Sequence, residues 1–222
     1  MTSCYYTVGI RRVRAGVQLG MRASHGLAFS ALLFVLTASA TAQEAYFPKN
    51  ALGRDVRSDQ RKAMWYSHEL KVLGEPSFFK LANNPSSESY RFLWLRTFHP
   101  PIAIRLDLQA DGSGILTTKT ANGEAGFPYT VKQLAKSGSR TIERERIQAL
   151  LGRLTRAGFW SLPPETYDQT GTDGSQWIIE GIKQGTYHFV DRWSPDEGSV
   201  RELGLMFIFD LAQMKIPEDQ VY

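Results

Sequence analysis

A strictly alternating stretch followed by a tight turn is the feature that most constrains the fold of this chain. Residues 102–109 read Ile-Ala-Ile-Arg-Leu-Asp-Leu-Gln, which places four aliphatic side chains on one face of an extended strand. The sequence Asp-Gly-Ser-Gly at 111–114 is typical of a turn, and residues 115–120 are again extended in pattern. This segment therefore predicts a β-hairpin, in which neighbouring strands run antiparallel.

A second hairpin is predicted near the end of the chain. Residues 176–183 and 186–193 are rich in β-branched and aromatic residues and flank the two-residue turn Gln-Gly at 184–185. Further strands are expected over residues 90–98 and, more weakly patterned, over 129–135. The sheet should therefore contain about five to six antiparallel strands.

Three helices are expected beside these strands. The first spans residues 58–73, and the second spans 143–157, where Ile147, Leu150, Leu151 and Leu154 form one apolar stripe. A last helix should begin at Ser194, with Glu197 completing a capping box. Helices with a single apolar stripe indicate packing on one face of the sheet, so the expected class is α+β.

The first 42 residues have the pattern of a secretory signal peptide. Arginines precede a ten-residue apolar run at 27–36, and small residues follow, so cleavage is expected after Ala40 or Ala42. A start at Met21 would shorten the charged region to its usual length, so Met1 and Met21 both stay open as starts. The apolar run is shorter than the roughly 20 residues of a membrane-spanning helix, which disfavours the alternative of an uncleaved anchor.

Removing this leader changes what the composition implies. Residues 1–42 contain four of the 26 basic residues, none of the 22 acidic residues and the only cysteine, Cys4. The mature chain therefore has no net charge and no thiol, which excludes thiol catalysis and cysteine–zinc sites. Neutral charge argues against nucleic-acid binding, and no phosphate-binding glycine motif is present, so no cofactor is expected.

The domain organisation follows from these patterns. Residues 43–58 are polar and lack periodicity, so we expect a flexible arm. Residues 59–222 should form a single α+β domain without a membrane span. The destination is export, either to the periplasm or to the medium.

The second hairpin carries the one pair of candidate catalytic residues. With a two-residue turn, Glu180 lies opposite Phe189 and Ile178 lies opposite Asp191, so Glu180 and Asp191 are diagonal neighbours on one face, about 7–8 Å apart. Two carboxylates at such a separation can perform acid/base chemistry on a glycosidic bond. The alternative is that each pairs with an arginine or faces water.

Four further residues are candidates for ligand binding, namely Trp177, His188, Arg192 and Trp193. Trp177 lies opposite Arg192 in the predicted register, which permits a cation–π contact. Trp193 precedes the last helix, where it can equally serve as a packing anchor. No pair of histidines has metal-ligand spacing, so no metal site is predicted.

The second half of the chain resembles a group of small exported bacterial proteins of unknown function. The resemblance rests on Gly-Phe-Trp with Leu-Pro at 158–163, on Asp-Gly with Trp and Glu at 173–180, and on Tyr-His and Asp-Arg-Trp-Ser-Pro at 187–195. It implies a protein of the bacterial envelope or the medium, and it implies no activity or catalytic residue.

Three functions are compatible with these features. The first is a non-catalytic domain of the bacterial envelope that binds a small ligand or an envelope protein. The second is a carbohydrate-directed hydrolase that uses Glu180 and Asp191. The third is an inhibitor or assembly factor, for which an exposed sheet edge, such as the strand at 90–98, would be needed.

Overall fold

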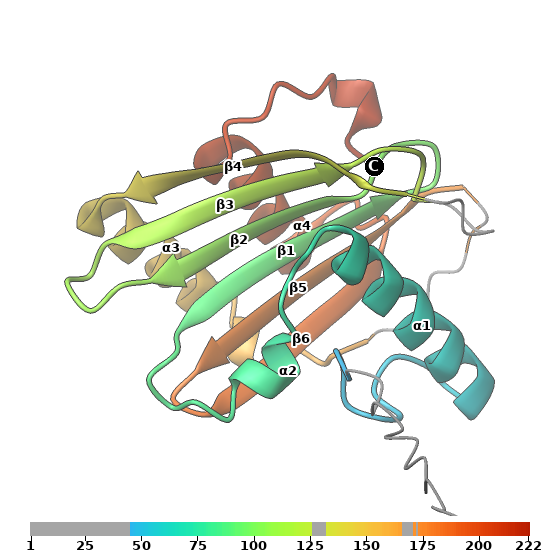
Figure 1. Ribbon diagram of the computed structural model, residues 1–222, viewed down its shortest axis with the longest axis horizontal. Helices are drawn as coiled ribbons and strands as arrows, with labels where there is room; N and C mark the ends of the chain where they lie inside the picture. The colour runs from blue at the N-terminus through green and yellow to red at the C-terminus, as the bar shows by residue number, and fades with distance from the viewer. Residues whose placement is uncertain (1–44, 126–131, 166–170, 172) are drawn as a thin grey trace, which may run out of the picture. The chain divides into compact units, whose positions relative to one another are not determined.

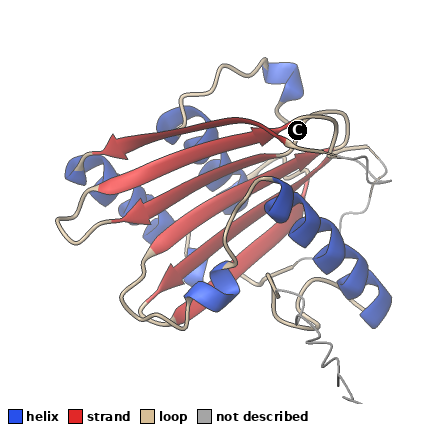
Figure 2. Ribbon diagram, viewed as in Figure 1, coloured by secondary structure: helices blue, strands red, loops and turns tan. Residues whose placement is uncertain are grey.

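The computed structural model describes residues 45–125, 132–165, 171 and 173–222, which all fall within one compact unit. Within these residues, six antiparallel strands form one sheet in the order β4-β3-β2-β1-β5-β6 (Figures 1 and 2). The strands are β1 (Ser89–Arg96), β2 (Ile102–Leu108), β3 (Gly114–Ala121), β4 (Leu134–Ile142), β5 (Ser175–Lys183) and β6 (Thr186–Trp193). The predicted α+β class and strand number are confirmed. The predicted signal peptide lies outside the described residues and stays a prediction.

The helices lie on both faces of this sheet, which corrects the expectation that they pack on one face. α1 (Val56–Val72) and the short α2 (Phe78–Leu81) lie on the face that Figure 1 shows in front, here called the α1 face. α3 (Arg144–Arg156) and α4 (Gly198–Leu205) cover the opposite face, here called the α4 face. The middle strands β1 and β5 are consequently buried on both sides.

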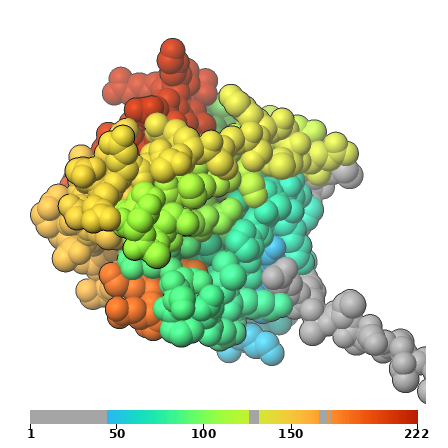
Figure 3. All heavy atoms as spheres, turned by 60° about the vertical axis from the view of Figure 1, so that its left-hand side comes forward, coloured from blue at the N-terminus to red at the C-terminus, as the bar shows by residue number. Residues whose placement is uncertain are grey.

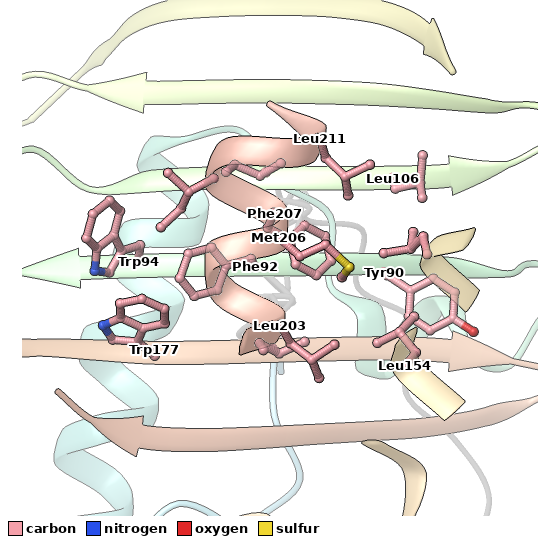
Figure 4. Packing of buried hydrophobic residues seen from close by; sticks show 14 of the residues in the cluster. Tyr90, Phe92, Trp94, Leu106, Leu154, Trp177, Leu203, Met206, Phe207 and Leu211 are labelled. Atoms are coloured by element: carbon pink, nitrogen blue, oxygen red, sulfur yellow. The ribbon is translucent and has the colours of Figure 1, made fainter. Parts of the chain in front are cut away.

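The α4 face holds the larger apolar core. Tyr90, Phe92 and Trp94 alternate along β1 and point toward α3 and α4, and Trp177 of β5 lies beside Trp94 (Figure 4). The last helix continues beyond α4 as one π-helical turn, η2 (Met206–Leu211), whose apolar side chains extend the same core. The predicted apolar stripe is therefore present, although its last turn is not regular α-helix.

The helix starts differ from those expected. α1 is capped by Asp55, whose side chain accepts from the amides of Arg57 and Ser58, while the Ser58 hydroxyl accepts from the amide of Asp55. The last helix has Glu197 as N-cap with no side-chain cap, because the Ser194 hydroxyl instead accepts from the amide of Ser175. The first shift arises from a local hydrogen-bond pattern and the second from a hydrogen bond to a residue 19 positions earlier, and the residue types alone leave both ambiguous.

Two other segments also depart from the expectation. The described part of the expected flexible arm is packed on the α1 face, where Tyr46, Phe47 and Leu52 are buried. The fourth strand, β4, lies later in the chain than predicted, and residues 126–131 lie outside the described residues. β4 and β6 form the edges of the sheet, so the strand predicted at 90–98, which corresponds to β1, is not an edge. Among the described residues, no helix is long and apolar enough to cross a membrane.

Candidate functional site

Both predicted carboxylates lie on the α1 face of the β5–β6 hairpin. The two strands pair in the predicted register, with Ile178 opposite Asp191 and Glu180 opposite Phe189. Glu180 and Asp191 therefore share one face, as the two-residue turn predicts. Their side chains are 0% and 1% exposed, because the elements on the α1 face cover them.

Glu180 is saturated by hydrogen bonds from two neighbours. Its Oε2 atom accepts from Nε and Nη2 of Arg91 at 2.8 and 2.6 Å, and its Oε1 atom accepts from the Tyr187 hydroxyl at 3.0 Å. Burial raises the pKa of the Glu180 carboxyl, and the Arg91 guanidinium opposes that rise. Glu180 thus has a fixed structural partner and no path to a substrate.

Arg91 connects this pair to a wider buried ion network. Its guanidinium lies 4.3 Å from the centre of the Phe78 ring, donates to the Pro76 carbonyl at 2.7 Å and approaches Glu75 at 3.4 Å. Glu75 also pairs with Arg105 at 3.0 Å and with Lys119 at 2.9 Å. The network therefore ties the segment between α1 and α2 to the middle of the sheet.

Asp191 makes a second set of contacts, to α1. Its Oδ2 atom accepts from the Tyr66 hydroxyl at 2.9 Å and from Lys62 Nζ at 3.0 Å, and Lys62 also pairs with Glu165. Burial raises the pKa of the Asp191 carboxyl, and Lys62 opposes that rise. These contacts attach α1 to the edge strand β6, so both predicted catalytic carboxylates lie in structural ion pairs.

Two of the four predicted ligand-binding residues also have structural partners. Trp177 is fully buried, and its Nε1 atom donates to Ser175 Oγ at 2.7 Å. Arg192 pairs with Trp177 in the strand register, but its guanidinium donates to the carbonyls of Pro163 and Pro164. The guanidinium over the Trp177 ring is that of Arg201, at 5.1 Å, because the α4 face brings the last helix across β5.

Trp193 and His188 complete the set. Trp193 packs on Gly174, where an added Cβ atom would lie 2.6 Å from the indole ring, so Trp193 is a packing anchor. His188 is half-buried against Phe159 and Trp160, with ring centroids 5.1 and 6.0 Å away. Burial lowers the pKa of His188, which keeps its ring neutral near pH 7.

A hollow of about 350 Å³ lies on the other side of the β5–β6 hairpin, against α3. It is called the aromatic pocket here, and it is formed by α3, the 3₁₀ turn η1 (Phe159–Ser161) and the tip of the hairpin. In the space-filling view, yellow-orange residues of α3 and η1 lie beside the orange hairpin (Figure 3). Its lining residues are Tyr90, Leu151, Leu154, Thr155, Trp160, Lys183, Gln184 and Thr186. An apolar floor with a few polar side chains around it is the usual composition of a small-molecule site.

Trp160 is the aromatic wall of this pocket, and other rings hold it in place. Tyr90 and Phe159 meet its indole edge to face, with centroids 6.2 and 5.2 Å away, and His188 lies behind it. Phe159 fits because β5 has Gly181 at this point, where a Cβ atom would lie 2.8 Å from the Phe159 ring. The half-exposed indole is therefore a rigid surface.

The tip of the hairpin supplies the polar side of the aromatic pocket. Gln184 and Gly185 both have positive φ, 50° and 78°, as a two-residue type I′ turn requires. A non-glycine residue in this conformation is strained, and such residues are concentrated at functional sites. Lys183 pairs with Glu88 at 3.2 Å, and Glu88 also accepts from the Tyr90 hydroxyl at 2.9 Å.

The sequence reasoning did not select this pocket. In the sequence, Trp160 stands out only as part of the Gly-Phe-Trp motif, and Gln184 only as a turn residue. The one available signal is that the longer side chain of Gln stands where Asn or Gly is usual in such a turn. In the part of the chain that the structure describes, no group of three or more His, Cys, Asp or Glu side chains could hold a metal ion.

Comparison with known proteins adds no further assignment. No protein-family model and no curated protein matches this chain. The function is therefore argued from the site alone.

Proposed function

We propose that this chain is an exported, non-catalytic domain of the bacterial envelope that binds a small ligand in the aromatic pocket. The observation that carries the proposal is the braced Trp160 indole beside the polar hairpin tip, in a hollow of about 350 Å³. None of the eight described residues that line the hollow is a carboxylate. The site can therefore hold a ligand, and it offers no acid/base pair to cleave one.

The hydrolase alternative receives no support from the positions of its two carboxylates. Glycoside cleavage requires a pair of carboxyl groups that reach the scissile bond from either side. Glu180 and Asp191 are instead buried and engaged by Arg91, Tyr66 and Lys62. A binding function needs neither carboxylate to be accessible.

Export is supported by the leader pattern of residues 1–42. The test is expression of the full chain in a Gram-negative host, followed by mass spectrometry of the periplasmic fraction. The proposal expects a mature protein that begins at Thr41 or Gln43. A full-length protein retained in the cytoplasm would contradict export.

Ligand binding is tested on the exported protein by amide NMR. The probes are a set of neutral sugars, amino acids and small aromatic acids, added one at a time. The proposal expects at least one class to shift the amides of Lys183, Gln184 and Thr186. If no probe in the set shifts these amides, the aromatic pocket is not the binding site.

A further inference from the structure

We infer that the aromatic pocket takes a neutral saccharide ring. This inference rests on the proposed function and adds the chemical class of the ligand. It depends on three properties of the described pocket residues: a rigid aromatic surface, a neutral polar rim and a side-chain amide that projects from a tight turn.

The aromatic surface is suited to a flat, aliphatic ring. A pyranose has an apolar face of C–H groups, and such a face packs on an indole ring. Trp160 offers its half-exposed ring without losing much conformational freedom on binding, because Tyr90 and Phe159 already fix it. The buried side chains of Tyr90 and Leu154 close the floor below it, so an extended apolar tail has no deeper cavity to enter.

The charge balance of the rim favours a neutral ligand. Lys183 is the one charged residue among the described lining residues, and Glu88 neutralises it at 3.2 Å. An anion would have to compete with Glu88 for Lys183, and a cation would be repelled by the Lys183 ammonium group. The other polar side chains are Tyr90, whose hydroxyl donates to Glu88, Thr155, whose hydroxyl donates to the Leu151 carbonyl, Thr186 and Gln184. Hydroxyls and an amide both donate and accept, as the hydroxyl groups of a sugar do.

The position of Gln184 is set by the hairpin and not by a flexible loop. Its φ of 50° and the neighbouring Gly185 fix the direction in which its side chain leaves the turn. Glycine would fit this backbone with less strain, and a role for the side chain would explain why an amide stands at this position. A hydrogen bond from the Gln184 amide to a ring hydroxyl supplies that role.

The test uses the exported protein and four probes: methyl β-glucopyranoside, the N-acetylglucosamine dimer, the open-chain polyol mannitol and benzoate. We expect both saccharides to shift the amides of Lys183, Gln184 and Thr186, with an affinity for a single ring of about millimolar. Mannitol carries hydroxyls without a ring face, and benzoate carries a ring with a charge. Neither should shift these amides.

Two variants locate the binding. Trp160→Ala should weaken saccharide affinity about tenfold or more, as expected for loss of a central aromatic contact. Gln184→Gly should weaken it about threefold to tenfold while leaving the fold intact, since glycine favours a positive φ. The matched control is Gln213→Gly, because Gln213 also has a positive φ (53°) and does not line the aromatic pocket. This control should leave saccharide affinity unchanged.

The outcomes separate the two proposals. Saccharide shifts that Trp160→Ala and Gln184→Gly reduce, and Gln213→Gly does not, support the inference. Shifts with benzoate or mannitol and none with the saccharides overturn the saccharide assignment and leave the binding function in place. Saccharide shifts that Gln184→Gly leaves at full strength contradict the role of the amide. If none of the four probes shifts these amides, the saccharide assignment is wrong, and the wider probe set decides whether the pocket binds any ligand.

Discussion

The two faces of the sheet differ in the kind of side chain that they bury. On the α4 face, Tyr90, Phe92 and Trp94 of β1 pack on the last helix, and the contacts are apolar (Figure 4). On the α1 face of the same strand, Arg91 is just as buried and is neutralised by Glu180 and Glu75. β1 therefore directs apolar side chains to the α4 face and a buried, neutralised cation to the α1 face, and both faces are covered.

This difference teaches how to interpret polar residues in a sequence such as this one. Glu180, Tyr187 and Asp191 have the chemistry of an active site. In the fold they form hydrogen bonds and ion pairs beneath the elements of the α1 face. Breaking a buried pair is costly because it leaves a buried charge without compensation, so such residues are needed for stability whether or not they bind anything.

The largest expected effect comes from breaking the buried pair on the α1 face. Glu180→Gln leaves the Arg91 guanidinium with Glu75, at 3.4 Å, as its remaining buried counterion. We expect the free energy of unfolding to fall by about 3–5 kcal/mol, measured by urea denaturation. The double variant Arg91→Met/Glu180→Met removes both charges and should recover most of that loss. A single variant as stable as the wild type would show that the pair is not buried as described.

On the α4 face, the free energy of unfolding should fall when a cavity is created, because no ion pair is broken there. Leu203→Ala removes a buried side chain of α4 that packs on β1 and β5, and we expect a loss of about 3 kcal/mol. Combined with Glu180→Gln, the two losses should add to within about 0.5 kcal/mol, since the residues lie on opposite faces and share no partner. Strong non-additivity would show that the two faces are coupled through the sheet.

The pH dependence of stability tests the α1 face, because the Asp191 carboxyl is buried there. Because burial raises the pKa of Asp191 in the folded state, the folded protein binds this proton more tightly than the unfolded chain does. The free energy of unfolding should therefore rise as the pH falls from the raised folded value toward the ordinary aspartate value. Asp191→Asn should flatten this part of the profile.

The comparison between Asp191→Asn and the wild type also removes the titration of His188, which does not contact Asp191. The pKa of His188 is lowered, which contributes the opposite slope as the pH falls, and it does so in both proteins. The measurement is urea denaturation at intervals between pH 4 and pH 7. Identical profiles for the two proteins would contradict the burial of a charged Asp191.

The smallest expected effect lies in the hairpin turn. Gln184→Gly should raise the free energy of unfolding by roughly 0.5–1 kcal/mol, because the left-handed backbone is strained for glutamine and relaxed for glycine. Gln213→Gly should give a similar gain for the same reason. Thermal unfolding of the three proteins measures both, and a loss of stability at position 184 would show that the Gln184 side chain contributes contacts to the folded state.

The sequence predicted the sheet better than the helices, for a physical reason. Alternation over 102–109 and the two-residue turn at 184–185 are local, so they determine strand, turn and register together. α1 has no clean apolar stripe because it buries Asp59 and Glu69 beside Tyr66 and Leu70. Its docking on the second face of the sheet could not be predicted from periodicity.

The candidate site was less accessible to prediction because its contacts are long-range. The partner of Glu180 is Arg91, 89 residues earlier, and the partners of Asp191 on α1 are more than 120 residues earlier. The pocket brings together β1, η1 and the hairpin tip, whose residues are unremarkable in isolation. The strand register determines on which face of the sheet each carboxylate lies, and tertiary contacts determine which residues cover it there.

One saccharide titration followed by NMR examines both regions in the same sample. The exported protein carries ¹⁵N in its amides and ¹³C in its Glu and Asp side-chain carboxyls, and the probe is the N-acetylglucosamine dimer. We expect the amides of Lys183, Gln184 and Thr186 to shift while the carboxyl signals of Glu180 and Asp191 stay in place. Shifts of the two carboxyl signals without shifts of the pocket amides would contradict a structural role for the carboxylates and a binding role for the pocket.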